Sequence, residues 1–411
     1  MGVFNHRAFI RKIVGTLRAS YWFWPSLLVV GALVLAEVIV WIDLNPDISA
    51  IPLPDRLTAI DPGGARDVLS TLATAVIGVA GVMFSMTLVA VSFAADTFGP
   101  RLIGNFMRDR GTQLSFGLLL GTFVFHVIML RAVQDGDTTF VPYLGLAAAL
   151  LLTLIAVFTI IYYIHHVPET INVSNIASNL GHRFAAEIRD LIATRAAQEA
   201  EDTAPEAGAR RWEVFLPYPG YLQQMDKDAL FDCARRGGWT AEVLLAPGDF
   251  TTPHAPVMVV HARAEPTPDQ MTELRDAFAT GDDRTESDSV LYVADQLVEM
   301  IARALSPGFN DPFTAMNCLN WLQAGLMDAL LHDGGLQPAA RRRVTFQDTD
   351  FASLFQSGFV AAAPYTTTDR MCCQRHLALT QELLRQATGA NRQVIADLLP
   401  VLRTPARKVR L

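Results

Sequence analysis

Polar and small residues recur between positions 67 and 99 at the spacing of one face of a helix. At about 100° per residue they fall within an arc of about 80°, and Val89 is the only apolar exception. No comparable face occurs on the other three apolar stretches of the chain. These residues, called the polar face below, are Asp67, Thr71, Thr74, Gly78, Gly81, Ser85, Ser92, Asp96 and Gly99.

The polar face has two open interpretations, because unsatisfied polar groups are penalised in lipid and must face protein or water. In the first, small residues let two helices approach closely and hydroxyl groups bond across the contact. In the second, the face is one wall of a permeation path in an oligomer, with the carboxylates of Asp67 and Asp96 as rings of charge at its two mouths. Close packing is the commoner use of such a face.

Two ionisable residues lie inside apolar stretches, where a charge costs free energy unless it is paired or hydrated. Glu37 is near the outer end of the first stretch, and we expect its side chain to extend to the outer interface. His126 lies on the third stretch and shares a face with Ser115 and Thr122. We expect a neutral imidazole bonded to a neighbouring helix, and the alternative is a role in proton relay or gating.

Signatures of enzymes and of metal sites are absent from the sequence. It contains no GxGxxG, Walker A, HExxH or GxSxG motif, so we expect neither an enzyme nor a cofactor. His165 and His166 are adjacent and would point about 100° apart on a helix, which makes a poor metal pair. For the adjacent Cys372 and Cys373, inert thiols are favoured over a redox pair. The net charge of −8 argues against nucleic acid as a partner.

The composition places these residues in a membrane protein. Of 411 residues, 51% are hydrophobic and 18% charged, which is too apolar for an ordinary soluble domain. A spanning helix needs about 20 predominantly apolar residues. Four segments meet this requirement, and they run approximately from Tyr21 to Ile42, Ser70 to Ala95, Leu114 to Leu130 and Pro142 to Ile164.

The distribution of Lys and Arg predicts the orientation of these spans, because positive loops resist translocation. Basic residues gather before the first span and in the second loop, namely Arg7, Arg11, Lys12, Arg18, Arg101, Arg108 and Arg110. Both termini should therefore be cytoplasmic. The second loop after Gly99 and Pro100 also has the pattern of a short helix on the inner leaflet, although a plain turn explains it equally well.

The predicted fold class is a mainly α membrane protein with four transmembrane helices followed by a cytoplasmic α+β domain. The transmembrane domain covers residues 1–166, and a helical stalk and linker cover 167–210. A small mixed α/β unit follows at 211–265, where "RWEVFLPYPGYLQQMD" predicts two short strands about a Pro-Gly turn. The rest, 266–411, should be helical, with helices near 269–280, 288–305, 311–332 and 368–402.

Several segments resemble a bacterial family of predicted membrane proteins known as a domain of unknown function. They are "SFAADTFGPRLIGNFMRDRGTQLSFGLLLGTFVFHVIMLRAV", "GYLQQMD", "GDF" and "DRTESDSVLYVADQLVEMIARALSPGFNDPFTA". The most specific residues are Arg284, Ala304, Leu305, Ser306, Pro307, Gly308, Asn310, Asp311 and Pro312. Phe309 departs from the usual Ile. The resemblance implies this topology and a bacterial inner membrane, but it supplies no mechanism.

Two functions follow as hypotheses. The first is a homo-oligomeric ion channel or similar permeation protein, with the second span lining the path and the cytoplasmic domain assembling or gating it. Its partners are the lipid bilayer, further copies of the chain and ions. The alternative is a membrane-anchored sensor or scaffold whose cytoplasmic domain binds a partner or a metabolite.

Overall fold

The structure is a computed structural model that describes residues 21–45, 54–98, 109–135, 139–196, 208–282, 284, 290–331, 343–347 and 349–403. The described chain forms two compact units, one ending at Asn172 and the other beginning at Val173. The second loop, for which a short helix on the inner leaflet and a plain turn are both open, lies outside the described residues except at its two ends.

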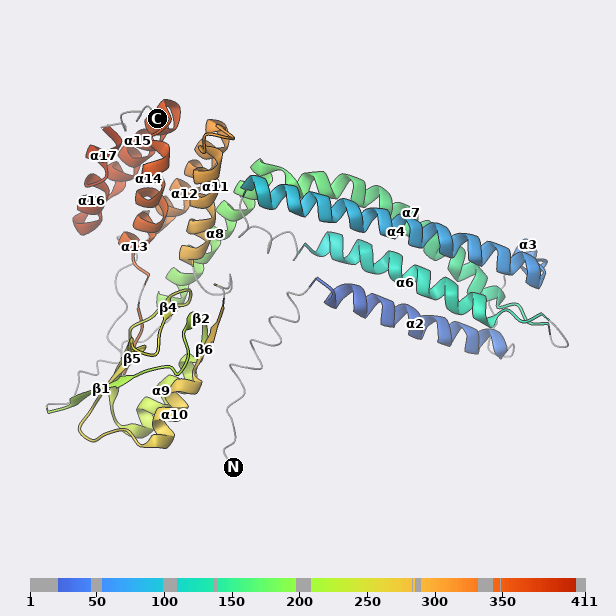
Figure 1. The fold of residues 1–411 in the computed structure, drawn as a ribbon, viewed down its shortest axis with the longest axis horizontal. Helices are drawn as coiled ribbons and strands as arrows, with labels where there is room; N and C mark the ends of the chain where they lie inside the picture. Colours follow the sequence, from blue (N-terminus) through green and yellow to red (C-terminus); the bar gives the residue numbers. More distant parts are fainter. Residues whose placement is uncertain are drawn as a thin grey trace. The chain divides into compact units, whose positions relative to one another are not determined.

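The first unit contains four helices that are long and apolar enough to cross a membrane. They are α2 (Phe23–Leu44), α4 (Pro62–Phe98), α6 (Arg110–Ala132) and α7 (Tyr143–Ile171), and a short α3 (Asp55–Thr58) precedes α4. The four long helices lie lengthwise beside one another (Figure 1). All four predicted spans are therefore present, and α4 begins eight residues before its predicted start and ends three residues after its predicted end.

Helix α6 is the central helix of this membrane domain, since it packs against α2, α4 and α7. Glycines on α6 allow the close approach of α2. A Cβ at Gly121 would stand 3.2 Å from the Leu28 carbonyl oxygen, and one at Gly117 would meet the Pro25 backbone at 2.7 Å. The small-residue packing expected in membranes is thus made by the α2–α6 pair.

Two carboxylates satisfy backbone N–H groups at the beginnings of helices, where no intrahelical acceptor exists. Asp109 precedes α6 and accepts from the Thr112 N–H at 2.7 Å. Asp43, at the end of α2, accepts from the N–H groups of Leu144 and Gly145 at 3.1 and 2.9 Å. Asp43 therefore connects the end of one span to the start of another.

The second unit includes a helical part built from α8 (Val173–Ala196), α11 (Val290–Ala304) and α12 (Pro312–Leu331). Further helices are α13 (Phe351–Phe355), the π-helix η2 (Gln356–Val360), α14 (Ala361–Thr366), α15 (Arg370–Gln386), α16 (Gly389–Ala396) and α17 (Leu399–Arg403). Helix α8 packs on α11 and α12, and Phe184 and Ile188 of α8 are fully buried. The prediction of a separate helical stalk is therefore wrong for α8, because an apolar face of this helix belongs to the core of the second unit.

The α/β part of the second unit contains two small sheets. One has the strand order β1 (Arg210–Val214), β5 (Met258–Ala262), β3 (Thr240–Val243), β7 (Val344–Thr345), and the other has the order β4 (Phe250–Thr251), β2 (Gly220–Met225), β6 (Phe278–Gly281). The predicted strands β1 and β2 exist, but they belong to different sheets and form no hairpin.

Helices α9 (Lys227–Gly237) and α10 (Pro268–Asp276) complete the α/β part. Leu230 of α9, Leu274 of α10, Phe278 of β6 and Val344 of β7 enter the same apolar core. This unit therefore continues past its predicted end at residue 265. The helix predicted near 269–280 ends at Asp276, and a strand replaces its last residues because Phe278 pairs with Met225 of β2.

Candidate functional site: the polar face of α4

The polar face lies on the outward side of α4. Each of its described members is exposed, from Asp67 through Ser85 to Asp96, and Gly99 lies outside the described residues. The buried residues of α4 are on the opposite side, about 180° from the centre of the polar face. They are Ala65, Leu69, Ala73, Val76, Ala80, Met83 and Ala94.

Close packing within the chain does not explain the small residues of the polar face. Atoms built as Cβ at Gly78 and Gly81 would have no neighbour within 4 Å, whereas those at Gly117 and Gly121 of α6 meet α2. Hydrogen bonds fix the opposite side of α4, where the Tyr163 hydroxyl donates to the Met83 carbonyl oxygen at 2.9 Å. The small residues of the polar face therefore make no close helix contact within the described part of the chain.

Large exposed apolar side chains flank the polar face on both sides. Ile77, Phe84 and Leu88 are on one flank, and Val82, Met86 and Phe93 are on the other. Such side chains suit lipid or the apolar surface of another helix. The polar face is consequently a narrow hydrophilic strip in the middle of an apolar surface.

The two carboxylates of the polar face are separated by the thickness of a membrane. Asp67 and Asp96 are 29 positions apart on one continuous helix. At 1.5 Å per residue this spacing is about 43 Å, close to a bilayer with its headgroup regions. In a bilayer that α4 crosses along its length, both carboxylates would reach water-accessible levels, and Gly78, Gly81 and Ser85 would be at the level of the hydrocarbon core.

Glu37 and His126 both have partners on neighbouring helices. The Arg131 guanidinium group of α6 pairs with Glu37 at 3.1 Å. From the sequence we expected the Glu37 side chain to extend to the outer interface, and we predicted no partner for it. His126 is fully buried, with Nδ1 2.6 Å from the Thr122 carbonyl oxygen and Nε2 3.1 Å from the hydroxyl oxygen of Thr153 on α7. His126 therefore makes the hydrogen bond to a neighbouring helix that we expected from the sequence.

Asp109 and His166 form a pair at the start of α6 that the sequence reasoning missed. His166 Nε2 lies 2.8 Å from Asp109 Oδ2, and the Tyr162 ring stacks on the imidazole. Burial acts to raise the pKa of Asp109, but hydrogen bonds from Thr112 and His166 outweigh it and keep this pKa below its usual value. The only sequence signal was an Asp three residues before Thr112, which is the spacing of a helix cap.

The signature residues of the suspected family occupy two places in the second unit. Ser306, Pro307, Gly308, Asn310, Asp311 and Pro312 form the turn between α11 and α12. Asn310 has a left-handed backbone with φ of +47°, and Asp311 caps α12 by accepting from the N–H groups of Phe313 and Thr314 at 3.1 Å. Asp311 is therefore the N-terminal cap of α12, and Pro312 takes the first helical position.

Arg284 connects the α/β part to the helical part. Its Nε donates to the Gly248 carbonyl oxygen at 2.7 Å, and its Nη1 donates to Asp295 of α11 at 2.8 Å. The Ser357 hydroxyl of η2 donates to the other Asp295 oxygen at 2.7 Å. Arg284 therefore holds the α/β part and the helical part together.

The cysteines have the environment of inert thiols. Cys372 and Cys373 are buried, and their Sγ atoms face the carbonyl oxygens of Pro312 and Leu402. Burial raises the pKa of Cys372 to about 12, far above that of a reactive thiol. Within the described part of the chain, no group of three His, Cys, Asp or Glu side chains is placed to hold a metal ion.

The fold and these residues define a membrane protein with four apolar helices and a following mixed α/β region. Residues 18–382 match the model of a family described as "Predicted membrane protein (DUF2254)", and the chain belongs to this family. The resemblance drawn from the sequence is thereby confirmed.

Two curated relatives are an uncharacterized protein of Mycobacterium bovis and one of Mycobacterium tuberculosis. Each is 27% identical over 289 residues, which are 68% of this chain and 55% of the relative. The chain thus spans about half the length of the curated relatives it matches. No solved structure matches it.

Proposed function

We propose that the protein is a homo-oligomeric ion channel of the bacterial inner membrane, in which polar faces of several α4 helices line the path. The observation that carries the proposal is the outward exposure of the polar face on the first unit. The backbone of this face is satisfied within the helix, as is the Thr74 hydroxyl by the Ser70 carbonyl oxygen at 2.8 Å, but the hydroxyl groups would lose their hydration in lipid. Assembly around water avoids that loss.

The flanks of the polar face support assembly. Side chains such as Phe84 and Met86 offer apolar area beside the polar face, where another copy of the helix could pack. Asp67 and Asp96 would then repeat around the axis as two rings of carboxylates, which favour cations over anions. Cations are therefore the proposed permeating class.

The proposed orientation follows the charge of the loops, with both termini and the second unit in the cytoplasm. There, the second unit would assemble the channel or gate it. The proposal describes transport and assigns no catalytic residue.

Ion flux through reconstituted protein tests the proposal. Purified protein in liposomes should release a cation gradient, and Ser85→Leu should reduce this flux at least about tenfold by closing the polar face with an apolar side chain. Met86→Leu is the matched control, because Met86 is exposed on a flank of the same turn. Flux that survives Ser85→Leu in an intact oligomer would remove the polar face from the path.

A second candidate function is a membrane-anchored sensor or scaffold, which a cavity in the α/β part favours. The oligomeric state in detergent separates the two candidates. A monomer cannot enclose a central path, whereas a sensor functions as a monomer or as an oligomer.

A further inference from the structure

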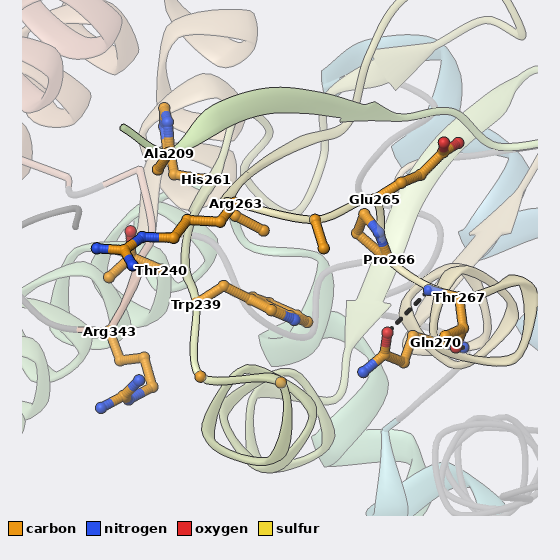
Figure 2. A pocket seen from close by; sticks show the side chains of 14 residues that line it. Ala209, Trp239, Thr240, His261, Arg263, Glu265, Pro266, Thr267, Gln270 and Arg343 are labelled. Atoms are coloured by element: carbon orange, nitrogen blue, oxygen red, sulfur yellow. Dashed lines mark hydrogen bonds between the residues drawn. The ribbon is translucent and has the colours of Figure 1, made fainter. Parts of the chain in front are cut away.

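A cavity of about 480 Å³ lies at one end of the four-stranded sheet, where β1, β3 and β7 begin and β5 ends. Its volume is within the range of small-molecule sites. The side chains that matter for its chemistry are Trp239, Thr240, His261, Arg263 and Arg343 (Figure 2).

The sheet register brings these residues together from distant parts of the sequence. His261 of β5 pairs with Thr240 of β3, and the Ala241 N–H donates to the Arg343 carbonyl oxygen at 2.8 Å. Arg263 directly follows β5. Rigid strands therefore place polar side chains from three segments at one end of the sheet, as a binding site requires.

The charge around the cavity favours an anion. Arg263 and Arg343 line it, and Glu265 is the carboxylate among its lining residues. In Figure 2 the Glu265 carboxylate lies on the opposite side of the view from both guanidinium groups. Within the described residues, no carboxylate forms an ion pair with Arg343.

An unsatisfied hydroxyl is a second, independent indication of a ligand. The Thr240 Oγ1 atom is buried and has no hydrogen-bond partner, although Thr240 lines the cavity. Buried hydroxyl groups normally find a partner, because water can no longer solvate them. Because Thr240 itself is only partly buried, rotation of its side chain can turn this hydroxyl toward an oxygen-rich ligand in the cavity.

Glycines keep the wall of the cavity open. A side chain at Gly237 would collide with the Trp239 indole, while Gly238 has φ of +67° and empty space where a Cβ would be. Trp239 itself is buried and forms a fixed wall. The end of α9 thus leaves room that larger residues would fill.

We propose that this cavity binds a small phosphorylated metabolite. A phosphate monoester carries about −1.5 to −2 charge at neutral pH, and its oxygens suit the guanidinium group of Arg343, with which no carboxylate of the described residues pairs. Its oxygens accept from arginine and from the Thr240 hydroxyl. Binding here is independent of conduction along α4.

The test is calorimetric titration of the purified full-length protein in detergent with adenosine 5′-monophosphate, inorganic phosphate and adenosine. The monophosphate and inorganic phosphate should bind, and adenosine should not. Arg343→Gln should weaken binding of the monophosphate at least about tenfold. Arg235→Gln is the matched control, because Arg235 is exposed and pairs with Asp232 away from the cavity.

Thr240→Val provides a second variant of nearly unchanged volume, should Arg343→Gln fail to fold. Thr240→Val should also weaken binding of the monophosphate, by a smaller factor than Arg343→Gln does. The proposal is wrong if neither phosphate compound binds at millimolar concentration, or if both variants bind the monophosphate as tightly as the unchanged protein. If the unchanged protein binds the monophosphate but conducts no ions in liposomes, the channel is contradicted and this site stands.

Discussion

The histidine at position 376 is held neutral by the core of the second unit. His376 of α15 is fully buried, its Nδ1 lies 2.8 Å from the Thr366 hydroxyl oxygen, and its Nε2 has no hydrogen-bond partner. Burial lowers the pKa of His376 from its usual 6.5 to about 3. Protonation therefore favours the unfolded chain, in which this imidazole is solvated.

Acid should consequently destabilise the second unit through His376. Its contribution to stability is complete above pH 6.5 and falls as the pH drops toward 3, by about 2 kcal/mol between pH 6.5 and pH 5. Chemical unfolding of the unchanged protein and of His376→Leu at several pH values measures the difference. The variant should lose less stability on acidification, and equal pH dependence in both proteins would contradict the account.

A strained backbone position in the α11–α12 turn gives another prediction. Asn310 has φ of +47°, a conformation that Gly and Asn adopt more readily than branched residues. Asn310→Val should lower the free energy of unfolding by about 1–2 kcal/mol, while Asn310→Gly should change it little. Thermal unfolding in detergent tests the pair, and equal transitions for the two variants would exclude strain at this turn.

Packing between elements distinguishes two helical glycines that look alike in the sequence. Gly325 of α12 faces the Phe184 ring of α8, whereas Gly78 of α4 faces open space. Gly325→Ala should destabilise the protein by about 1–3 kcal/mol through overpacking. Gly78→Ala lacks that clash and should keep or raise stability. Unfolding curves that rank the two variants the other way would refute this assignment of packed and open faces.

The local sequence pattern was enough to predict the membrane-spanning helices and one helix boundary of the second unit. The spans could be predicted because about 20 apolar residues in a row have few other structures, and the α11–α12 turn because Pro and Asp fix its ends. Strand partners could not be predicted. β7 joins β3 from about 100 positions away, and nothing local to Val344 encodes that partner.

The sequence predicted the polar face but not its direction. Helical spacing groups Thr74, Ser85 and Asp96, yet it does not say which side of α4 contacts α6 and α7. Ion pairs across helices were hidden for the same reason, since the Glu37–Arg131 pair depends on how α2 and α6 align. The segment from Phe351 to Thr366 was missed because a π-helix interrupts its helical period.

At the scale of the whole molecule, the channel proposal predicts a stable assembly. An outward polar face would expose its hydroxyl groups to acyl chains in an isolated chain, so copies should associate in detergent and in bilayers. Size-exclusion chromatography with light scattering measures the mass of the protein alone. A monomer under all mild detergent conditions would leave the polar face without the proposed function.

The most direct test is the accessibility of the polar face to water, read through single introduced cysteines. The native thiols give little background, because all four are buried. A membrane-impermeant, water-soluble thiol reagent should label Ser85→Cys in proteoliposomes and should leave Leu88→Cys, on the apolar flank, unlabelled. If the water-soluble reagent labels neither variant and a lipid-soluble reagent labels both, a water-filled path along α4 is contradicted.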